Sequence, residues 1–125
     1  MAVEQNILKA RRWFTGENKQ LKFKGFGEDG VTPMDMTGMN FRFVLADDPE
    51  GAIELTKESP AGISVIGVFD EDPDLNTQAV EVSIVPADTA ALFKGRHYYS
   101  LVRIDPGFVG VVAFGYWEAE KVAGL

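Results

Sequence analysis

The sequence predicts an all-β protein, an antiparallel sandwich with one short crossover helix. Apolar and polar residues often alternate with a period of two, whereas helical periodicity is scarce. Clusters of Gly, Pro, Asp and Asn separate the apolar runs, so that strands recur about every 10 to 15 residues. The length of 125 residues fits one such domain with an additional N-terminal arm.

The expected strands carry apolar side chains at alternate positions. The clearest case is residues 80–84, in which three aliphatic residues alternate with Glu81 and Ser83. Segments 96–104 and 110–117 are apolar on both faces. They predict central strands that are covered on both sides, or strands with one face in the core and the other in an interface. The remaining alternating sets are Leu21 and Phe23; Phe41, Phe43 and Leu45; Ile53 and Leu55; and Ile63, Val65 and Phe69.

A short helix is predicted within residues 86–92. This run contains helix-forming residues behind Asp88, whose carboxylate can cap the first turn. It has room for at most about two turns. A crossover between the two sheets of a sandwich is the expected role.

Composition and charge exclude several classes of function. The net charge of −7 disfavours binding to nucleic acid, because phosphate contacts need a positive field. The absence of cysteine excludes disulfides, thiol catalysis and cysteine-ligated metals. The first residues do not read as a signal peptide, and no apolar stretch approaches the roughly 20 residues that span a bilayer. We therefore expect a soluble protein that binds neither nucleic acid nor membrane.

The basic residues concentrate near the N-terminus. Six of the 12 Lys and Arg lie in the first 24 residues, and the rest of the chain is acidic. Two interpretations stay open: the basic arm of one copy contacts the acidic body of another, or lysines protect a solvated edge strand. We divide the chain into an arm or edge strand, 1–16, and a sandwich domain, 17–125. The arm is too apolar for a free tail and should pair as a strand with the body or with a neighbour. Its apolar residues are Ile7, Leu8, Trp13 and Phe14.

Two acidic or glycine-rich motifs resemble ligand sites. Residues 25–30 spell G-x-G-x-x-G, but no helix start follows, and Glu28 and Asp29 would repel phosphate. We interpret this motif as a glycine-rich turn. Residues 70, 72 and 74 are aspartates at positions 1, 3 and 5 of a possible calcium loop, with Glu81 at position 12. Because Leu75 replaces the required glycine, we interpret the segment as a solvated acidic loop, with weak calcium binding as the alternative.

No motif predicts catalysis. His97 is the only histidine, so it cannot build a His-based metal site, and no G-x-S-x-G nucleophile motif accompanies it. We expect it to pack in the sheet with hydrogen bonds at a strand end. Pairs of acids are frequent by chance among 19 carboxylates, and nothing places two of them across a cleft. We expect neither an enzyme nor a cofactor.

The aromatic residues of the last hairpin are the more informative set. They fall on both strand faces, so some of them should lie outside the core. An exposed aromatic patch indicates a partner surface, and a thick core or a covered sheet is the alternative. With the basic arm, this gives a hypothetical interface made of Lys9, Arg11, Arg12, Trp13, Phe14, Phe108, Tyr116 and Trp117.

The order of turn and packing residues carries a family resemblance that spans about Gly16 to Trp117. The matching positions are Gly16-Glu17, Asp29-Gly30, Asp35-Met36-Thr37-Gly38, Asp88-Thr89, Leu92, Gly95, Tyr99 and Leu101. They resemble the immunoglobulin-like domain of phage baseplate upper proteins and related small phage tail proteins. Met36 stands where that family usually has Leu, and His97 where it often has Tyr.

The resemblance implies an immunoglobulin-like antiparallel β-sandwich and a structural role in a virion. The protein would be made in the host cytoplasm and would join a phage tail or baseplate by contacting copies of itself and other virion proteins. Asp35 and Thr37 would bond backbone groups of a turn, and Gly38 would supply a positive φ. Asp88 would cap the crossover turn, and Gly95 is a further structural turn residue.

Two other roles remain as alternatives. A head decoration or head-to-tail connector protein uses the same small β domains and the same kind of arm. A carbohydrate-binding sandwich for recognition of a host surface predicts exposed aromatic residues beside Asp, Asn or Arg, and weak glycan contact. The fold alone does not decide between these functions.

Overall fold

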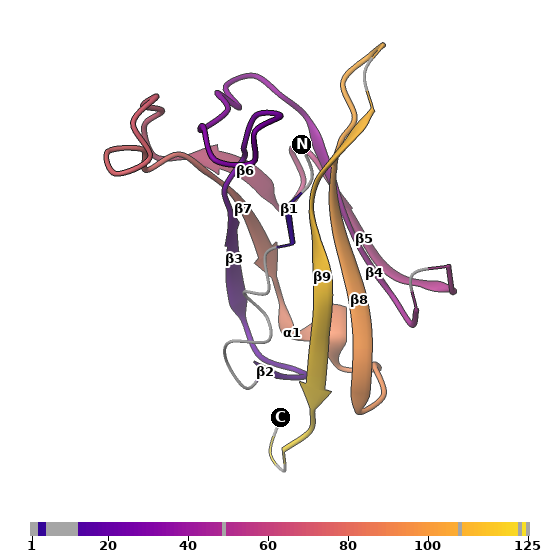
Figure 1. Cartoon of the computed structure of the whole chain (residues 1–125). Coiled ribbons are helices and arrows are strands. Elements are labelled where there is room, and N and C mark those ends of the chain that lie inside the picture. Colours follow the sequence, from indigo (N-terminus) through magenta and orange to yellow (C-terminus); the bar gives the residue numbers. More distant parts are fainter. Residues whose placement is uncertain (1–2, 5–12, 49, 108, 123, 125) are drawn as a thin grey trace.

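The computed structural model describes residues 3–4, 13–48, 50–107, 109–122 and 124. It is a two-layer sandwich: six strands form the larger sheet, three form the smaller one, and a short helix lies at one end between them (Figure 1). The predicted antiparallel β-sandwich with one short crossover helix is therefore confirmed.

The larger sheet has the strand order β1-β9-β8-β4-β5, and β2 also pairs with β9. Strands β4, β5, β8 and β9 are antiparallel neighbours, whereas β1 and β2 both pair with β9 in parallel. The bounds are β1, Val3–Glu4; β2, Trp13–Phe14; β4, Phe41–Ala46; β5, Ile53–Glu58; β8, Gly95–Arg103; and β9, Gly110–Glu120.

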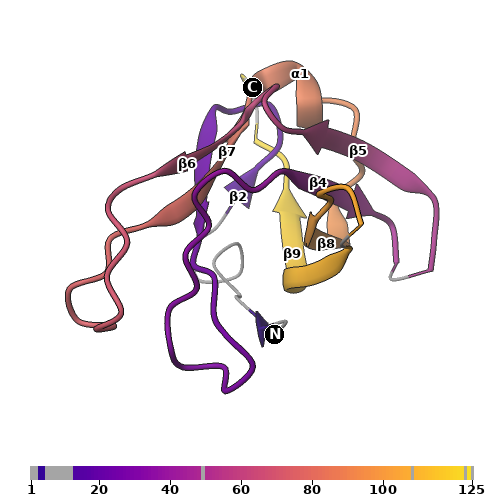
Figure 2. The same ribbon diagram turned by 90° about the horizontal axis from the view of Figure 1, so that it is seen from above.

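The smaller sheet has the order β3-β7-β6, and the view from above shows it as a separate layer facing the larger sheet (Figure 2). Its strands are β3, Lys19–Phe23; β6, Ile63–Ile66; and β7, Ala79–Ile84, followed by the helix α1, Pro86–Thr89. In chain order, β3, β6 and β7 occupy the places of strands B, D and E of an immunoglobulin sandwich. Strands β4, β5, β8 and β9 occupy those of C, C′, F and G.

Alternating side chains fill the space between the sheets. Every predicted inward residue of β3, β4 and β7 is buried. Phe69 is an exception to the predicted pattern, because β6 ends at Ile66 and Phe69 lies in the following loop, where it is half-buried. The largest fully buried side chains are Trp13, Trp117, Phe23, Phe41, Phe43 and Met36.

A β-bulge corrects the prediction for β5. Leu55 pairs with Leu45, but Ile53 pairs with Ala46, so Glu54 is an extra residue opposite the Leu45–Ala46 step. A bulge of this kind moves one side chain to the opposite face. Ile53 is consequently 66% exposed on the outer face, although its spacing predicted that it would share the face of Leu55.

The turn before β4 agrees with the predicted roles. The Asp35 carboxylate accepts hydrogen bonds from the Thr37 N–H and hydroxyl at 3.0 and 2.7 Å, and Gly38 has a φ of +77°. The side chain of Gln78, the residue immediately before β7, completes the hydrogen bonding of this turn. Its amide donates to Asp35 and Thr37, and its Oε1 accepts the Met36 N–H at 2.8 Å.

The helix α1 is shorter than the predicted run. Asp88 lies in its first turn rather than at the N-cap position, which Val85 occupies. Its carboxylate nevertheless accepts the Val85 N–H at 2.8 Å, and it forms an ion pair with Lys57 at 2.8 Å. Asp88 therefore caps the helix as predicted, although it lies in the first turn and not at the N-cap position. Gly95 begins β8 with a φ of +132°, which explains a glycine there.

Candidate interaction surface

The outer face of the larger sheet is rich in apolar side chains. Strand pairing sets out two rows across it: Ile53, Ala46, Tyr98 and Tyr116 in one, and Thr56, Val44, Ser100 and Phe114 in the other. Phe114 is 43% exposed, and Tyr98 and Ser100 of β8 are half-buried. The sequence left open whether this second face is covered, and these exposures show that Ile53 and Phe114 remain open to solvent.

A groove of about 410 Å³ runs over this face. Ala46 and Ser100 are small residues between larger neighbours, so they leave a hollow that Ile53, Tyr98 and Phe114 flank. The complete lining is Val44, Ala46, Asp48, Glu50, Gly51, Ile53, Tyr98, Tyr99, Ser100, Phe114 and Gly115.

The turn between β4 and β5 forms an acidic lip of the groove. Asp48 Oδ1 accepts the Glu50 N–H at 2.8 Å, and the Asp48 carbonyl accepts the Gly51 N–H at 3.0 Å. These bonds order the turn, and both Asp48 and Glu50 line the groove. The lip therefore presents negative charge next to apolar and aromatic surface.

Arg96, the cation beside Tyr116, already has an acidic partner. Arg96 donates to Glu118 at 3.0 Å, and its guanidinium lies 4.4 Å from the centre of the Tyr116 ring. The hydrogen bonds to Glu118 and Tyr98 raise the pKa of Arg96, so it stays charged. This arrangement fixes the Tyr116 ring at one end of the face.

The predicted interface residues separate into three groups. Trp13 and Trp117 are buried in the core, with ring centres 3.9 Å apart, so their side chains do not face a partner as predicted. Phe14 and Tyr116 are half-buried. Lys9, Arg11, Arg12 and Phe108 lie outside the described residues. The two buried indole N–H groups have no hydrogen-bond partner among the described residues.

Strand β2 explains why Trp13 is internal. It pairs in parallel with the end of β9, and Thr15 N donates to the Glu120 carbonyl at 2.9 Å. Gly16 N donates to the Thr89 hydroxyl at 2.9 Å, which ties this segment to α1. The described part of the arm thus pairs with the body of its own chain.

His97 is fully buried, as expected for a histidine packed in the sheet. Its Nε2 lies 2.8 Å from the Phe93 carbonyl and its Nδ1 lies 2.5 Å from Glu54 Oε1. The ring packs between Phe93 and Trp117. The sequence missed the Glu54 partner, because only the bulge of β5 turns that carboxylate inward.

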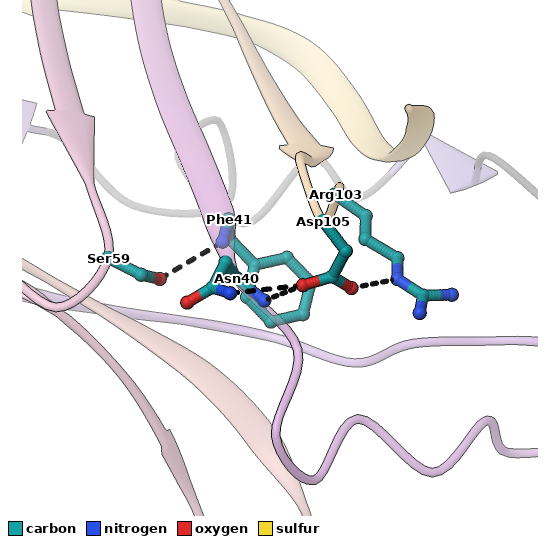
Figure 3. A network of polar contacts seen from close by, with 5 residues as sticks. All are labelled: Asn40, Phe41, Ser59, Arg103 and Asp105. Carbon is teal, nitrogen blue, oxygen red and sulfur yellow. Dashed lines mark hydrogen bonds and ion pairs between the residues drawn. The ribbon is translucent and has the colours of Figure 1, made fainter. Parts of the chain in front are cut away.

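A polar network at the Phe41–Arg103 end of β4 and β8 was also not predicted from the sequence (Figure 3). Asp105 accepts hydrogen bonds from the Asn40 N–H and amide at 2.9 and 3.1 Å, and it forms an ion pair with Arg103. The Arg103 contact, followed by the Asn40 bonds, lowers the pKa of Asp105. The Phe41 N–H donates to Ser59 at 3.0 Å, so the network joins the ends of three strands.

The two ligand-like motifs form turns. In the glycine-rich segment, Gly27 N donates to the Thr32 carbonyl and Asp29 accepts from residues 31 and 32, as expected for a turn. In the acidic loop, Asp70 and Asp72 accept backbone N–H groups of their own loop. Within the described ranges, no three His, Asp or Glu side chains are grouped so that they could hold a metal ion.

Comparisons with protein-family models, curated proteins and solved structures found no match. In the part of the chain that the structure describes, no helix is long and apolar enough to cross a membrane.

Proposed function

We propose that this chain is a structural protein of a phage virion, a tail or baseplate component that works through protein–protein interfaces. The supporting observation is the open apolar face of the larger sheet, with Ile53 and Phe114 exposed beside the groove. Contiguous apolar surface of this kind favours association in soluble proteins. The resemblance in the turn residues supports a phage particle as the place of that association.

The first test is the oligomeric state. Light scattering after size-exclusion chromatography should give a defined oligomer of the 13.7 kDa chain. Phe114→Glu places a charge in the face and should yield a monomer. Val68→Glu is the matched control, because Val68 is 73% exposed in a loop away from this face, and it should assemble normally. A wild-type chain that stays monomeric up to millimolar concentration would contradict contact between copies of this chain through this face.

The virion assignment has its own test. Mass spectrometry of purified tailed particles should detect the chain in a fixed ratio to other tail proteins. Antibody labelling should then place it on the tail or baseplate; labelling of the head would support the decoration or connector alternative instead.

A glycan-binding module is the second candidate. The groove holds Tyr98 and Phe114 beside Asp48 and Glu50, and aromatic rings next to carboxylates suit sugar faces and hydroxyls. Saturation-transfer NMR with bacterial surface oligosaccharides would show contacts that Asp48→Asn and Phe114→Glu abolish. Absence of transfer from every sugar class would eliminate this candidate.

A further inference from the structure

The groove has a definite chemical preference. Its hollow is lined by aliphatic and aromatic residues, and the acidic residues Asp48 and Glu50 form its lip. A ligand that fills it well combines an aliphatic side chain with an adjacent positive charge. An acidic or purely polar segment would leave the hollow unfilled or would repel the lip.

The chain itself contains a segment with this chemistry. Residues 5–12 include Ile7 and Leu8, followed by three cations within four residues, Lys9, Arg11 and Arg12. The rest of the sequence is strongly acidic. Charge complementarity therefore favours this segment as the occupant.

The anchors of the segment limit which groove it can enter. Glu4 pairs beside Phe114 and Trp13 beside Ala119, so four residues of β9 lie between anchors that eight residues of the chain connect. The anchors are about 17 Å apart, because a strand rises about 3.3 Å per residue. The eight residues between the anchors are more than a straight path of this length needs.

The lip of its own chain lies at the limit of what a segment of this length can span. The lip lies beside β4 and β5, three to four strand spacings from the anchors, which is about 14 to 19 Å. A path out to the lip and back to the second anchor is roughly 33 to 42 Å long. Nine Cα–Cα steps span at most about 32 Å. While both anchors stay paired, a backbone path to the lip of the same chain would exceed full extension, which favours the lip of another copy.

From these observations we propose that the groove binds the basic segment 5–12 of a second copy of this chain. The inference rests on the proposed function and names one of its contacts. The aliphatic residues would enter the hollow, and the cations would pair with Asp48 and Glu50.

The test is a charge reversal that keeps the turn intact. Asp48→Asn with Glu50→Lys retains the side-chain acceptor at position 48 and reverses the lip. Lys9→Glu with Arg11→Glu and Arg12→Glu reverses the segment. Each variant alone should lose the oligomer, and an equimolar mixture of the two should associate at least tenfold more tightly than either alone. Fluorescence of the buried Trp13–Trp117 pair checks that both variants are folded.

A matched control carries the same change of charge elsewhere. Glu28→Lys with Glu71→Gln alters two exposed carboxylates in loops away from the groove and should assemble like the wild type. If the lip variant also assembles like the wild type, the segment does not bind the groove, while the Phe114→Glu result still decides the proposed function. If the wild-type chain is a monomer throughout, the groove does not bind a second copy, and the mass spectrometry of purified particles decides the proposed function.

Discussion

At the scale of single residues, the hydrogen bonds of His97 determine where its protons lie. The Phe93 carbonyl can only accept, so Nε2 carries a hydrogen. A carboxylate also accepts, so the contact of 2.5 Å between Nδ1 and Glu54 requires a proton on one of the two groups. Either assignment leaves the buried pair with no net charge, which lowers the cost of burying it.

Substitutions of Glu54 should therefore differ according to whether they can still reach Nδ1. Glu54→Ala leaves a buried ring nitrogen without a partner and should lower the free energy of unfolding by about 1 to 3 kcal/mol. Glu54→Gln can donate from its amide to a neutral ring, so its loss should be under about 1 kcal/mol. Urea denaturation followed by tryptophan fluorescence measures both values. Equal losses for the two variants would mean that the hydrogen bond contributes nothing.

Asp29 gives the fold a dependence on acid. Bonds from the Thr32 hydroxyl, and then from the backbone N–H groups of residues 31 and 32, lower its pKa from 3.8 to about 2. Because the folded-state pKa is the lower one, the ionised group stabilises the fold above about pH 4, and this contribution disappears as the pH falls towards 2.

The prediction is a difference in Tm between wild type and Asp29→Asn that is positive at pH 7 and vanishes near pH 2. Glu28→Gln removes the same charge from the adjacent position and serves as the control. Thermal denaturation followed by circular dichroism measures the three proteins. A Tm difference for Asp29→Asn that is constant from pH 7 to 2 would show that the ionised carboxylate does not contribute.

At the scale of elements, the strands were predictable where one face alone is apolar. The alternation in β7 placed Val80, Val82 and Ile84 in the core, and all three are buried. In β9, both faces are apolar, so the sequence could not decide which aromatic residues point inward. Register alone places Trp117 in the core and Tyr116 outside.

The candidate site was less predictable because its elements meet only in the folded chain. The bulge that exposes Ile53 depends on how β5 pairs with β4, and no local residue pattern predicts it. Gln78 supports a turn 42 residues away from its own position in the chain. The groove combines a turn with four strands, so its composition is visible only after the sheet is assembled.

Strand β2 belongs to the core rather than to a detachable arm, which changes where the chain can be shortened. Trp13→Ala removes a fully buried ring that packs against Trp117 and should cost about 3 to 5 kcal/mol in the free energy of unfolding. Removal of residues 1–12 retains this ring and should cost less. Removal of residues 1–14, which would be natural for a free arm, should destabilise at least as much as Trp13→Ala.

Urea denaturation of the three variants tests this order. Phe14→Ala is the control within the same strand, because Phe14 is only half-buried and its loss should be smaller than that of Trp13. A 1–14 truncation as stable as the wild type would show that β2 adds nothing to the core.

At the scale of the whole molecule, two electrostatic effects act on association in opposite directions. Each copy carries a net charge of −7, and two copies about 30 Å apart repel by about 7 kcal/mol in unscreened water. Screening lowers this to roughly 2 to 3 kcal/mol at 0.01 M salt and to about 0.2 kcal/mol at 0.15 M. A contact between the basic segment and the lip acts over about 4 Å, at about 1 kcal/mol per pair, and keeps more than half of that at 0.15 M.

Association should therefore be strongest at intermediate salt. Repulsion between whole molecules weakens it at 0.01 M, and loss of the local pairs weakens it again as the salt approaches 1 M. The variant Lys9→Gln with Arg11→Gln and Arg12→Gln has a net charge of −10, that is −7 minus 3, and lacks the local pairs. Its association should be weaker than that of the wild type. It should only increase with salt, because salt screens the repulsion between the copies and leaves the apolar contact in place. Sedimentation equilibrium from 0.01 to 1 M sodium chloride distinguishes the two curves, and a wild-type curve that also only rises would mean that apolar contact alone joins the copies.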